Sequence, residues 1–525
     1  LEKDSYGKLR FVSGINPQSF SWELTPETHF DTPEAVLSYS SKGYGRLSRQ
    51  LHSFIREHIV RGVWKRRPRP VLLNSWEACY FKIDERKLLQ LAKAGADVGV
   101  ELFVMDDGWF SGRNDDTSSL GDWEPDPKKL PGGIVSLSKK IKALGVDFGL
   151  WVEPEMISEN SRLYQEHPDW AMMIPGHPHS EGRNQRLLDL CNPEVQQYVI
   201  DSMTKVFSSG EIRYVKWDMN RNFSDIYSPY LPAAKQGETA HRYVLGLYHI
   251  MDELTTRFPE ILFEGCSSGG NRFDLGILNY FSQIWASDNT DALCRTGIQN
   301  SYSYGYPLSV FTAHVSSCPN HQTLRITPLE TRFQVASFGV LGYECNLKDL
   351  SGSDLNAIRE QIALYKKWRD VFQFGTFYRG TENEDSDSET LSWTCVSPDG
   401  RRAVGLFFRR LTTPNQSHDW YRPVGLFPDV KYHFYGRNIK YNLKDFGDLV
   451  NTVSPVHIKQ GSALQEILSR FVNMDGEKEE LTAYGDTLML AGIALKPAFA
   501  GTGYNSDTRL FPDFSSRMYF MEAVE

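Results

Sequence analysis

The sequence predicts an α/β protein with a (β/α)₈ TIM barrel, a C-terminal antiparallel β-sandwich and a remnant of an N-terminal β domain. Eight short apolar runs recur between residues 71 and 342, and helix-like stretches separate them. Buried parallel strands are continuous apolar runs, and their alternation with helices indicates βα units. Eight such units in one domain are typical of a (β/α)₈ barrel.

The eight predicted strands share this apolar character, and most are followed by polar residues. They are Val71–Trp76, Glu101–Asp106, Asp147–Val152, Tyr214–Asp218, Ile261–Gly265, Gln283–Asp288, Leu308–His314 and Ala336–Gly342. An open, doubly wound sheet is the structural alternative. A G-x-G-x-x-G motif follows none of the early strands, which counts against a dinucleotide-binding version of that sheet.

Changes in pattern divide the chain into three parts. Residues 1–68 are the tail of an N-terminal β domain plus a linker helix, because apolar residues lie at helical spacing over 46–63. Residues 69–375 form the catalytic barrel. Residues 376–525 form the sandwich, with turn residues between its short strands. The sandwich strands are expected at Thr390–Val396, Ala403–Phe408, Lys431–Tyr435 and Ala483–Leu490, and the acidic run 382–389 is expected to be a solvated loop.

Composition excludes several classes of partner. The net charge is −9, with both signs scattered, whereas nucleic acids and anionic membranes require a basic stripe. A membrane span is not expected, since no run of 18 apolar residues occurs. The seven cysteines contain no C-x-x-C pair, which indicates free thiols in a reducing compartment. We therefore expect a cytoplasmic protein, although the chain begins with Leu1 rather than Met.

Carboxylates gather where the predicted strands end. Asp106, Asp107, Glu153, Asp218 and Asp288 all follow apolar runs. Active sites of (β/α)₈ barrels are built at this carboxyl end. A structural network of ion pairs is the alternative explanation for these side chains.

Two of these carboxylates match the needs of glycoside hydrolysis, in which one attacks and the other donates a proton and then activates water. Lys216 lies two residues before Asp218, on the same strand face, and its charge would keep Asp218 ionised as a nucleophile. Asp288 follows the apolar Ile284–Ala286, and partial desolvation would raise its pKa and suit it to acid/base work.

Seven motifs extend these two residues into a family pattern. They are Asp106-Asp-Gly-Trp-Phe, Gly149-Leu-Trp-Val-Glu-Pro-Glu-Met, Gly182-Arg-Asn-Gln, Lys216-Trp-Asp-Met-Asn-Arg, Cys266-Ser-Ser-Gly-Gly-Asn-Arg-Phe-Asp, Trp285-Ala-Ser-Asp-Asn-Thr-Asp and Ala313-His-Val-Ser with Pro319-Asn-His-Gln. In this order they resemble the bacterial α-galactosidases of glycoside hydrolase family 36, over about residues 10–495. Seven motifs in order are far more specific than one.

The resemblance implies a retaining exo-glycosidase that removes terminal α-linked galactose from oligosaccharides or glycoconjugates by double displacement. It implies Asp218 as nucleophile and Asp288 as acid/base. It also implies a substrate-binding set consisting of Asp106, Asp107, Trp151, Arg183, Lys216, Asn220, Cys266 and Gly269. The aspartate pair would accept hydrogen bonds from the galactose O4 and O6 hydroxyls, and Trp151 would form a wall against the sugar ring. The pattern implies no metal and no cofactor.

Departures from the family pattern keep alternatives open. Most of the N-terminal β-sandwich of full-length members is absent, which puts the usual tetramer in doubt while leaving a homo-oligomer open. Leu293-Cys294 stands where many relatives have Ile-Glu, and the ending after residue 500 is longer than usual. The same mechanism would serve an α-N-acetylgalactosaminidase, an α-galactosaminidase or a transglycosylating synthase. A non-catalytic carbohydrate-binding protein is the alternative from another class.

Overall fold

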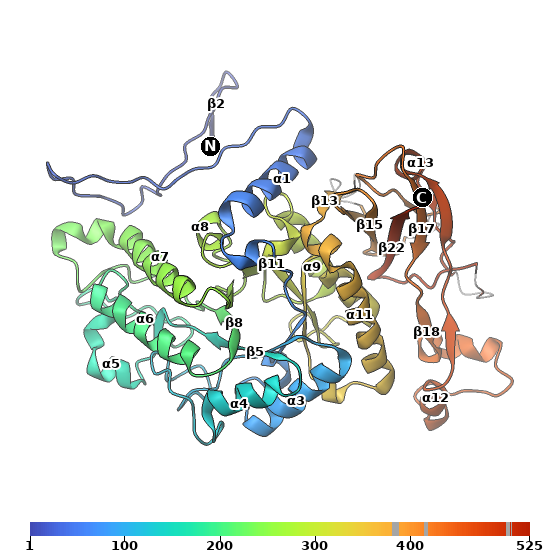
Figure 1. The fold of residues 1–525 in the computed structure, drawn as a ribbon, viewed down its shortest axis with the longest axis horizontal. Coiled ribbons are helices and arrows are strands. Elements are labelled where there is room, and N and C mark those ends of the chain that lie inside the picture. Colours follow the sequence, from blue (N-terminus) through green and yellow to red (C-terminus); the bar gives the residue numbers. More distant parts are fainter. Residues whose placement is uncertain (381–387, 414–417, 500–504, 506, 525) are drawn as a thin grey trace.

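Eight parallel strands close into a barrel at the centre of the molecule (Figure 1). The structure is a computed structural model that describes residues 1–380, 388–413, 418–499, 505 and 507–524. Around the barrel the strands follow the order β3, β4, β5, β8, β9, β10, β11 and β12. Their bounds are β3 Leu72–Asn74, β4 Leu102–Met105, β5 Asp147–Val152, β8 Ile212–Trp217, β9 Leu262–Gly265, β10 Gln283–Trp285, β11 Phe311–Ser316 and β12 Val340–Glu344.

Each barrel strand is followed by a helix, as the alternating pattern predicts. These helices are α3 Glu85–Val98, α4 Gly133–Lys142, α6 Pro193–Ser208, α7 Thr239–Arg257, α8 Leu275–Leu278, α9 Ala292–Tyr302, α10 Leu329–Ser337 and α11 Gly352–Phe374. The predicted (β/α)₈ barrel is thereby confirmed, and the doubly wound alternative is excluded. The strands close on themselves, so their carboxyl ends all meet at one mouth.

Local sequence fixes where these helices begin and end. The side chain of Asp84 accepts a hydrogen bond from the Lys87 amide at the start of α3, and Gly99 ends that helix with a φ of 97°. The side chain of Asp291 likewise caps α9 through the Cys294 amide, at 3.0 Å. This cap places the first residue of α9, Ala292, four residues after Asp288.

The last two barrel strands begin later than the apolar runs predict. A 3₁₀ turn occupies Leu308–Val310 before β11, and α10 extends to Ser337 before β12. Residues 308–310 and the last turn of α10, residues 333–337, are buried, and a short buried helical turn is as apolar as a buried strand. The pattern therefore finds the right elements with shifted boundaries.

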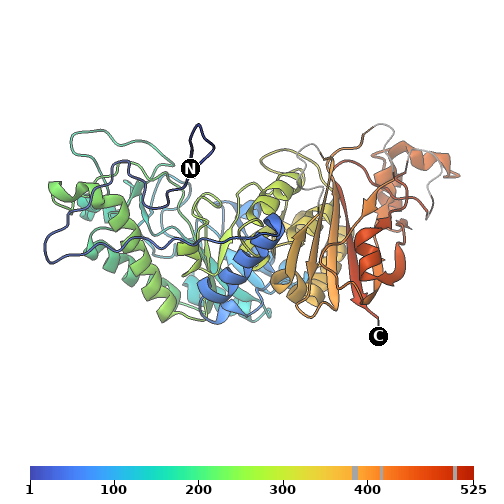
Figure 2. The same cartoon turned by 90° about the horizontal axis from the view of Figure 1, so that it is seen from above.

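A six-stranded antiparallel sheet follows the barrel, at one end of the molecule (Figure 2). Its strands, in spatial order, are β13 Thr376–Arg379, β14 Thr390–Val396, β15 Arg402–Arg409, β22 Ser515–Ala523, β17 Lys431–Gly436 and β20 Glu480–Tyr484. Two short ribbons accompany this sheet: β16 Trp420–Tyr421 with β21 Ile493–Ala494, and β18 Lys440–Asn442 with β19 Asn473–Asp475. Tyr421 and Ile493 pack on the sheet beside Tyr432 and Phe434.

Two features of this region differ from the sequence-based expectation. The predicted strand Ala483–Leu490 is wrong beyond Tyr484, because Gly485–Leu490 form the helix α13, and a 3₁₀ helix Leu443–Thr452 and α12 Ala463–Leu468 are also present. The long ending supplies β22, which lies between β15 and β17 in the middle of the sheet. Most of the acidic run 382–389 lies outside the described residues.

The N-terminal segment contains little regular structure. A two-residue ribbon pairs β1 Glu2–Lys3 with β2 Leu9–Arg10, and residues 11–42 form no strand, contrary to expectation. A strand needs a neighbour to bond its backbone groups, and the described residues offer none there. A helix lies where helical spacing predicts one: α1 Gly43–Phe54, which continues as one π-helical turn Ile55–Ile59.

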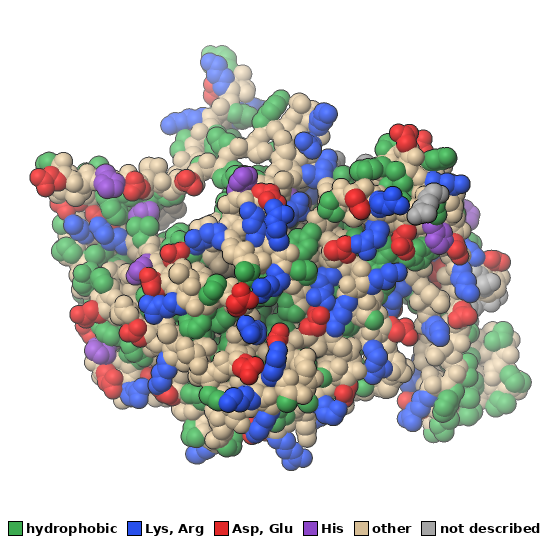
Figure 3. All heavy atoms as spheres, viewed as in Figure 1, with side chains coloured by type: hydrophobic (Ala, Val, Ile, Leu, Met, Phe, Trp, Pro, Cys, Tyr) green, Lys and Arg blue, Asp and Glu red, His purple; other side chains and the backbone are tan. Residues whose placement is uncertain are grey.

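The visible face of the molecule carries charges of both signs, and its described cysteines are unpaired. Lys and Arg are interspersed with Asp and Glu over the face in Figure 3. No helix within the described ranges combines the length and the apolar character needed to cross a bilayer. All seven cysteines fall within those ranges, and each is a free thiol.

Candidate active site

Asp218 lies at the barrel mouth, directly after β8, and is almost fully buried. Its Oδ2 accepts hydrogen bonds from Trp151 Nε1 at 3.1 Å and from Asn220 Nδ2 at 2.8 Å. Its Oδ1 accepts from the Met219 amide at 2.8 Å. Strand β5 supplies Trp151 and the turn after β8 supplies Asn220, so two adjacent strands fix the orientation of one carboxylate. The indole N–H of Trp151 thus faces Asp218, a contact that the sequence does not reveal.

The charge of Lys216 acts on Asp218 at a distance. Burial opposes ionisation, but the Lys216 ammonium and hydrogen bonds to the carboxylate outweigh it, and the pKa of Asp218 lies below its usual value. The ammonium itself bonds Asp106 Oδ2, at 3.0 Å. The expected effect of Lys216 on Asp218 is therefore present, although the direct hydrogen bond goes to another carboxylate.

The surroundings of Asp288 shift its pKa in the direction opposite to that of Asp218. It reaches solvent at the mouth, and its Oδ1 accepts a hydrogen bond from Trp285 Nε1 at 2.8 Å. Desolvation by the surrounding protein, followed by the negative charge of Asp218, raises the pKa of Asp288. The pKa values of these two carboxyl groups at the mouth are therefore shifted in opposite directions.

A short chain of contacts joins Asp218 to Asp288. Asn220 Oδ1 accepts from Ser268 Oγ at 3.0 Å, in the turn after β9. The next residue, Gly269, lies so close to the β10 loop that a Cβ would come within 3.0 Å of the Asp288 amide nitrogen. The φ of Gly269 is 89°, which favours glycine. The predicted Cys266-x-x-Gly269 element therefore lies between the two aspartates.

Asp106 and Asp107 directly follow β4 and lie beside these residues. Asn74 Nδ2 donates to Asp106 Oδ2 at 2.7 Å. Arg113 forms a bidentate pair with Asp107, its Nε 3.0 Å from Oδ1 and its second nitrogen 2.8 Å from Oδ2. Both aspartates are almost fully buried, and desolvation raises the pKa of Asp107 although Arg113 lowers it. The pair therefore presents firmly held acceptor oxygens to the mouth.

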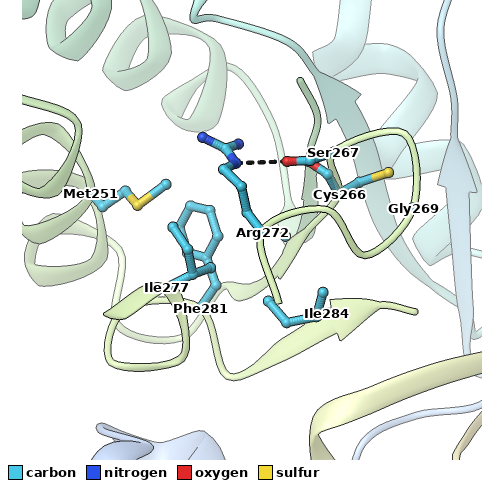
Figure 4. Close-up of a pocket in the computed structure, with 9 residues that line it drawn as sticks. Met251, Cys266, Ser267, Gly269, Arg272, Ile277, Phe281 and Ile284 are labelled. Atoms are coloured by element: carbon cyan, nitrogen blue, oxygen red, sulfur yellow. Dashed lines mark hydrogen bonds between the residues drawn. The ribbon is translucent and has the colours of Figure 1, made fainter. Parts of the chain in front are cut away.

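Cys266 follows β9 directly and is buried. Desolvation and the nearby Asp218 charge raise the pKa of its thiol well above its usual value, so the thiol stays protonated and donates to Asp218. A cavity of about 10 Å³, with room for about one water, borders this turn. Figure 4 shows Arg272 beside it, donating to Ser267 Oγ at 2.6 Å.

Arg183 is the member of the predicted set that lies farthest into solvent. Its side chain is about half exposed, and its nearest charged partner is Asp116, at 3.9 Å. Its φ of 54° belongs to the segment that precedes the two-residue strand β7 Arg186–Leu187. The other seven predicted binding residues gather around Asp218 and Asp288, whereas no described contact ties Arg183 to either aspartate.

The predicted catalytic and binding residues did not include Glu153, a second buried carboxyl group beside Asp218. Glu153 accepts from the Asn220 amide, and also from Gln185 Nε2 at 3.1 Å. Desolvation, helped by the charge of Asp218, raises the pKa of Glu153 to about 8. Glu155 instead pairs with Arg272, at 2.8 Å. The sequence shows that Glu153 directly follows an apolar run, but the contacts that raise its pKa exist only in the folded protein.

The two histidines of the Ala313-His-Val-Ser and Pro319-Asn-His-Gln motifs each bond a carboxylate. His314 Nδ1 lies 2.9 Å from Glu344 Oε2, and His321 Nδ1 lies 2.9 Å from Glu77 Oε1. In the described ranges, no three His, Cys, Asp or Glu side chains are grouped to hold a metal ion.

Two family models match the chain. The model described as Melibiase covers residues 29–375, and the Glycosyl hydrolase family 36 C-terminal domain covers residues 390–521. Among curated proteins, alpha-galactosidase AgaA of Geobacillus stearothermophilus is 46% identical over 439 residues, which are 84% of this chain and 60% of AgaA. Alpha-galactosidase 1 of Pediococcus pentosaceus is 46% identical over 82% of this chain and 59% of its own length. The chain thus spans about 60% of the length of these relatives.

Solved structures show the same similarity in three dimensions. The crystal structure of Geobacillus stearothermophilus AgaA superposes with a TM-score of 0.86 at 42% identity, covering 100% of this chain and 65% of that one. A doubly substituted AgaA in complex with raffinose superposes with a TM-score of 0.84 at 42% identity, covering 97% and 63%. From the barrel, its mouth and these matches, it follows that the chain belongs to the melibiase family and has the C-terminal domain of glycosyl hydrolase family 36.

Proposed function

We propose that this chain hydrolyses terminal α-linked galactosides with retention of configuration, using Asp218 as nucleophile and Asp288 as acid/base. The main observation in support is the opposed electrostatics of these two carboxyl groups at one barrel mouth. The pKa of Asp218 is lowered and that of Asp288 is raised, and the charge of Asp218 contributes to the second shift. Double displacement requires this difference between a charged attacker and a protonated donor.

The proposed reaction has two steps. In the first, an Asp218 oxygen attacks C1 of galactose while Asp288 donates its proton to the glycosidic oxygen, and the aglycone leaves as an alcohol. In the second, Asp288 removes a proton from water, the resulting hydroxide attacks C1, and the bond to Asp218 breaks. Two inversions return the α-anomer, and both carboxyl groups regain their starting states.

The proposed galactose site uses the residues around this pair. Asp106 and Asp107 accept from the O4 and O6 hydroxyls, and Trp151 packs against the sugar ring while its N–H steadies Asp218. Lys216, Asn220 and Arg183 bond ring hydroxyls, and Cys266 and Gly269 lie near O2. Neither a metal nor a cofactor enters the proposed chemistry.

Relatives support galactose as the substrate class. AgaA is named an alpha-galactosidase, and its variants have been crystallised with raffinose and with stachyose. Both sugars carry terminal α-galactose. We also propose the division into residues 1–68, 69–375 and 376–525, which the end of α11 at Phe374 supports.

Hydrolysis of an aryl α-galactoside, followed by NMR of the first-formed sugar, tests the proposal. We expect the α-anomer first, and loss of turnover on the order of 10⁴-fold in Asp218→Asn, with unchanged circular dichroism. The aryl α-N-acetylgalactosaminide is assayed in parallel, because its relative rate shows whether the site prefers galactose or N-acetylgalactosamine. Hydrolysis of that substrate alone, the β-anomer as first product, or binding without turnover would each overturn the proposal.

A further inference from the structure

Arg295 is a buried charge that the proposed reaction does not use. It lies on α9, is 2% exposed, and burial lowers its pKa to about 10. None of the ion pairs found among the described residues involves it. Burying a guanidinium away from a carboxylate is costly, so its hydrogen bonds must compensate.

Those hydrogen bonds converge on the loop that bears Asp288. Arg295 donates to the carbonyl of Ser287 at 2.9 Å and to the carbonyl of Asn289 at 2.9 Å. A third bond, at 3.1 Å, reaches the carbonyl of Thr312 on β11. The planar fork of one guanidinium therefore holds the backbone on both sides of Asp288 and ties it to a barrel strand.

The same guanidinium also contacts the side chain that bonds Asp288. Its central carbon lies 4.5 Å from the centre of the Trp285 ring, within the range of a cation–π contact. The Trp285 ring also contacts the His314 ring, with centroids 4.4 Å apart, and Glu344 fixes His314. Trp285 is only 3% exposed, so its N–H has one settled direction, toward Asp288 Oδ1.

We propose that Arg295 and Trp285 are positioning residues for the acid/base, with Arg295 holding the backbone around Asp288 and Trp285 holding one of its carboxyl oxygens. This inference rests on the proposed function of Asp288. Because Oδ1 accepts the indole N–H, the carboxyl proton belongs on Oδ2. Arg295 and Trp285 thus determine which oxygen of Asp288 donates the proton to the departing aglycone.

Several other charged or titratable groups act on Asp288 besides this pair. Those with a direct effect on its pKa are Asp218 and Lys216 on the β8 side and Glu344 at the end of β12. Cys266, Arg295 and His321 also interact with its charge. None of these groups changes in Trp285→Phe, so a change in the pKa of Asp288 in that variant reports on the loss of the indole N–H.

Leaving-group dependence separates positioning of the acid from a general structural role. Cleavage of a phenyl or methyl α-galactoside needs protonation of the departing oxygen, whereas 2,4-dinitrophenolate leaves without it. We expect Trp285→Phe and Arg295→Lys to lower kcat/KM for the methyl substrate by about 100-fold, and for the dinitrophenyl substrate by less than about threefold. In Trp285→Phe the alkaline limb of kcat/KM should also move to higher pH, because the lost N–H favoured the carboxylate.

The chain offers a matched control for each variant. Arg69 is also buried, also bonds backbone carbonyls, Ser282 at 3.2 Å among them, and lies near the start of β10, at the opposite end of that strand from Asp288. Trp393 is a buried indole on β14 whose N–H bonds the Asn300 side chain at 3.2 Å. Arg69→Lys and Trp393→Phe should keep the wild-type ratio of kcat/KM for the two substrates, whatever they do to thermal stability.

The outcomes are distinct. Equal losses on both substrates in Trp285→Phe and Arg295→Lys, or a changed ratio in the controls, would overturn the positioning role while leaving the proposed function intact. A parent chain that cleaves neither galactoside would overturn the proposed function instead. If Arg295→Lys fails to fold, Trp285→Phe, which leaves every backbone hydrogen bond in place, decides the question alone.

Discussion

The backbone of Gly269 lies so close to that of Asp288 that no side chain fits between them, although 19 positions separate the two residues in the sequence. A Cβ on Gly269 would lie 3.0 Å from the Asp288 amide nitrogen and 2.9 Å from the Ser287 Cα. The turn after β9 and the loop after β10 can therefore meet only if residue 269 has no side chain. This contact places the turn that carries Cys266, whose thiol donates to Asp218, directly against the proposed acid/base.

Gly269→Ala should displace the Asp288 loop. Alanine at a φ of 89° is strained and also lacks room, so we expect unfolding free energy to fall by about 1–3 kcal/mol and kcat to fall about 100-fold. Urea denaturation and aryl galactoside kinetics measure the two effects. Gly297, in the interior of α9 with open space around it, gives the control: Gly297→Ala should keep full activity and gain about 0.5–1 kcal/mol. Unchanged kcat in Gly269→Ala would refute the contact.

Lys216→Met should shift both limbs of the pH profile of kcat/KM to higher pH. The Lys216 charge lowers the pKa of Asp218 and also that of Asp288. The acid limb of kcat/KM follows ionisation of Asp218, and the alkaline limb follows deprotonation of Asp288. Without the charge both pKa values rise, so both limbs should shift to higher pH. Lys366→Met, which removes an ammonium bonded to the Gly99 carbonyl outside the mouth, should leave both limbs in place. A shift to lower pH would contradict the assignment.

Glu153→Gln should remove a pH-dependent cost to stability. Because the pKa of Glu153 is about 8 in the folded protein and its usual value is 4.5, the folded protein holds a proton that the unfolded chain loses. Stability from this group is therefore lost progressively as pH rises from about 4.5 to about 8. Glutamine can still accept the Asn220 and Gln185 hydrogen bonds, so the variant should gain stability over the parent across that window.

Urea denaturation at pH 5 and pH 8.5 measures this gain. The difference between Glu153→Gln and the parent should be small at pH 5 and larger, in favour of the variant, at pH 8.5. Glu155→Gln provides the contrast, since it removes one partner of the ion pair with Arg272 and should destabilise the protein by about 3 kcal/mol at both values. An equal effect of Glu153→Gln at both pH values would show that Glu153 is not protonated in the fold.

The barrel could be predicted because its signal is local. Each of the eight apolar runs contains a barrel strand or part of one, and the two aspartates follow their strands at the carboxyl end. Boundaries shifted at β11 and β12, where buried helical turns have the same composition as buried strands. The segment Gly485–Leu490 was misassigned for the same reason, since a short apolar run does not distinguish a helix from a strand.

The partners of the site residues could not be predicted, because they depend on tertiary contacts. Nothing in the sequence around Trp151 indicates that its indole N–H turns toward Asp218, or that Lys216 bonds Asp106. Arg295 lies in a helix of ordinary composition, and its hydrogen bonds to three carbonyls appear only when α9 packs beside β10 and β11. Residue identity limits what each group can do, while the fold determines which group it contacts.

Trapping the covalent intermediate tests the central claim most directly. The parent chain, incubated with an activated 5-fluoro-galactosyl fluoride and digested with trypsin, should carry one sugar on the peptide Trp217–Arg221, which contains Asp218. Fragmentation by mass spectrometry should assign the label to that aspartate, and Asp218→Asn should remain unlabelled. A label on the peptide 273–295, which contains Asp288, or turnover with no covalent adduct and an inverted product, would contradict the account.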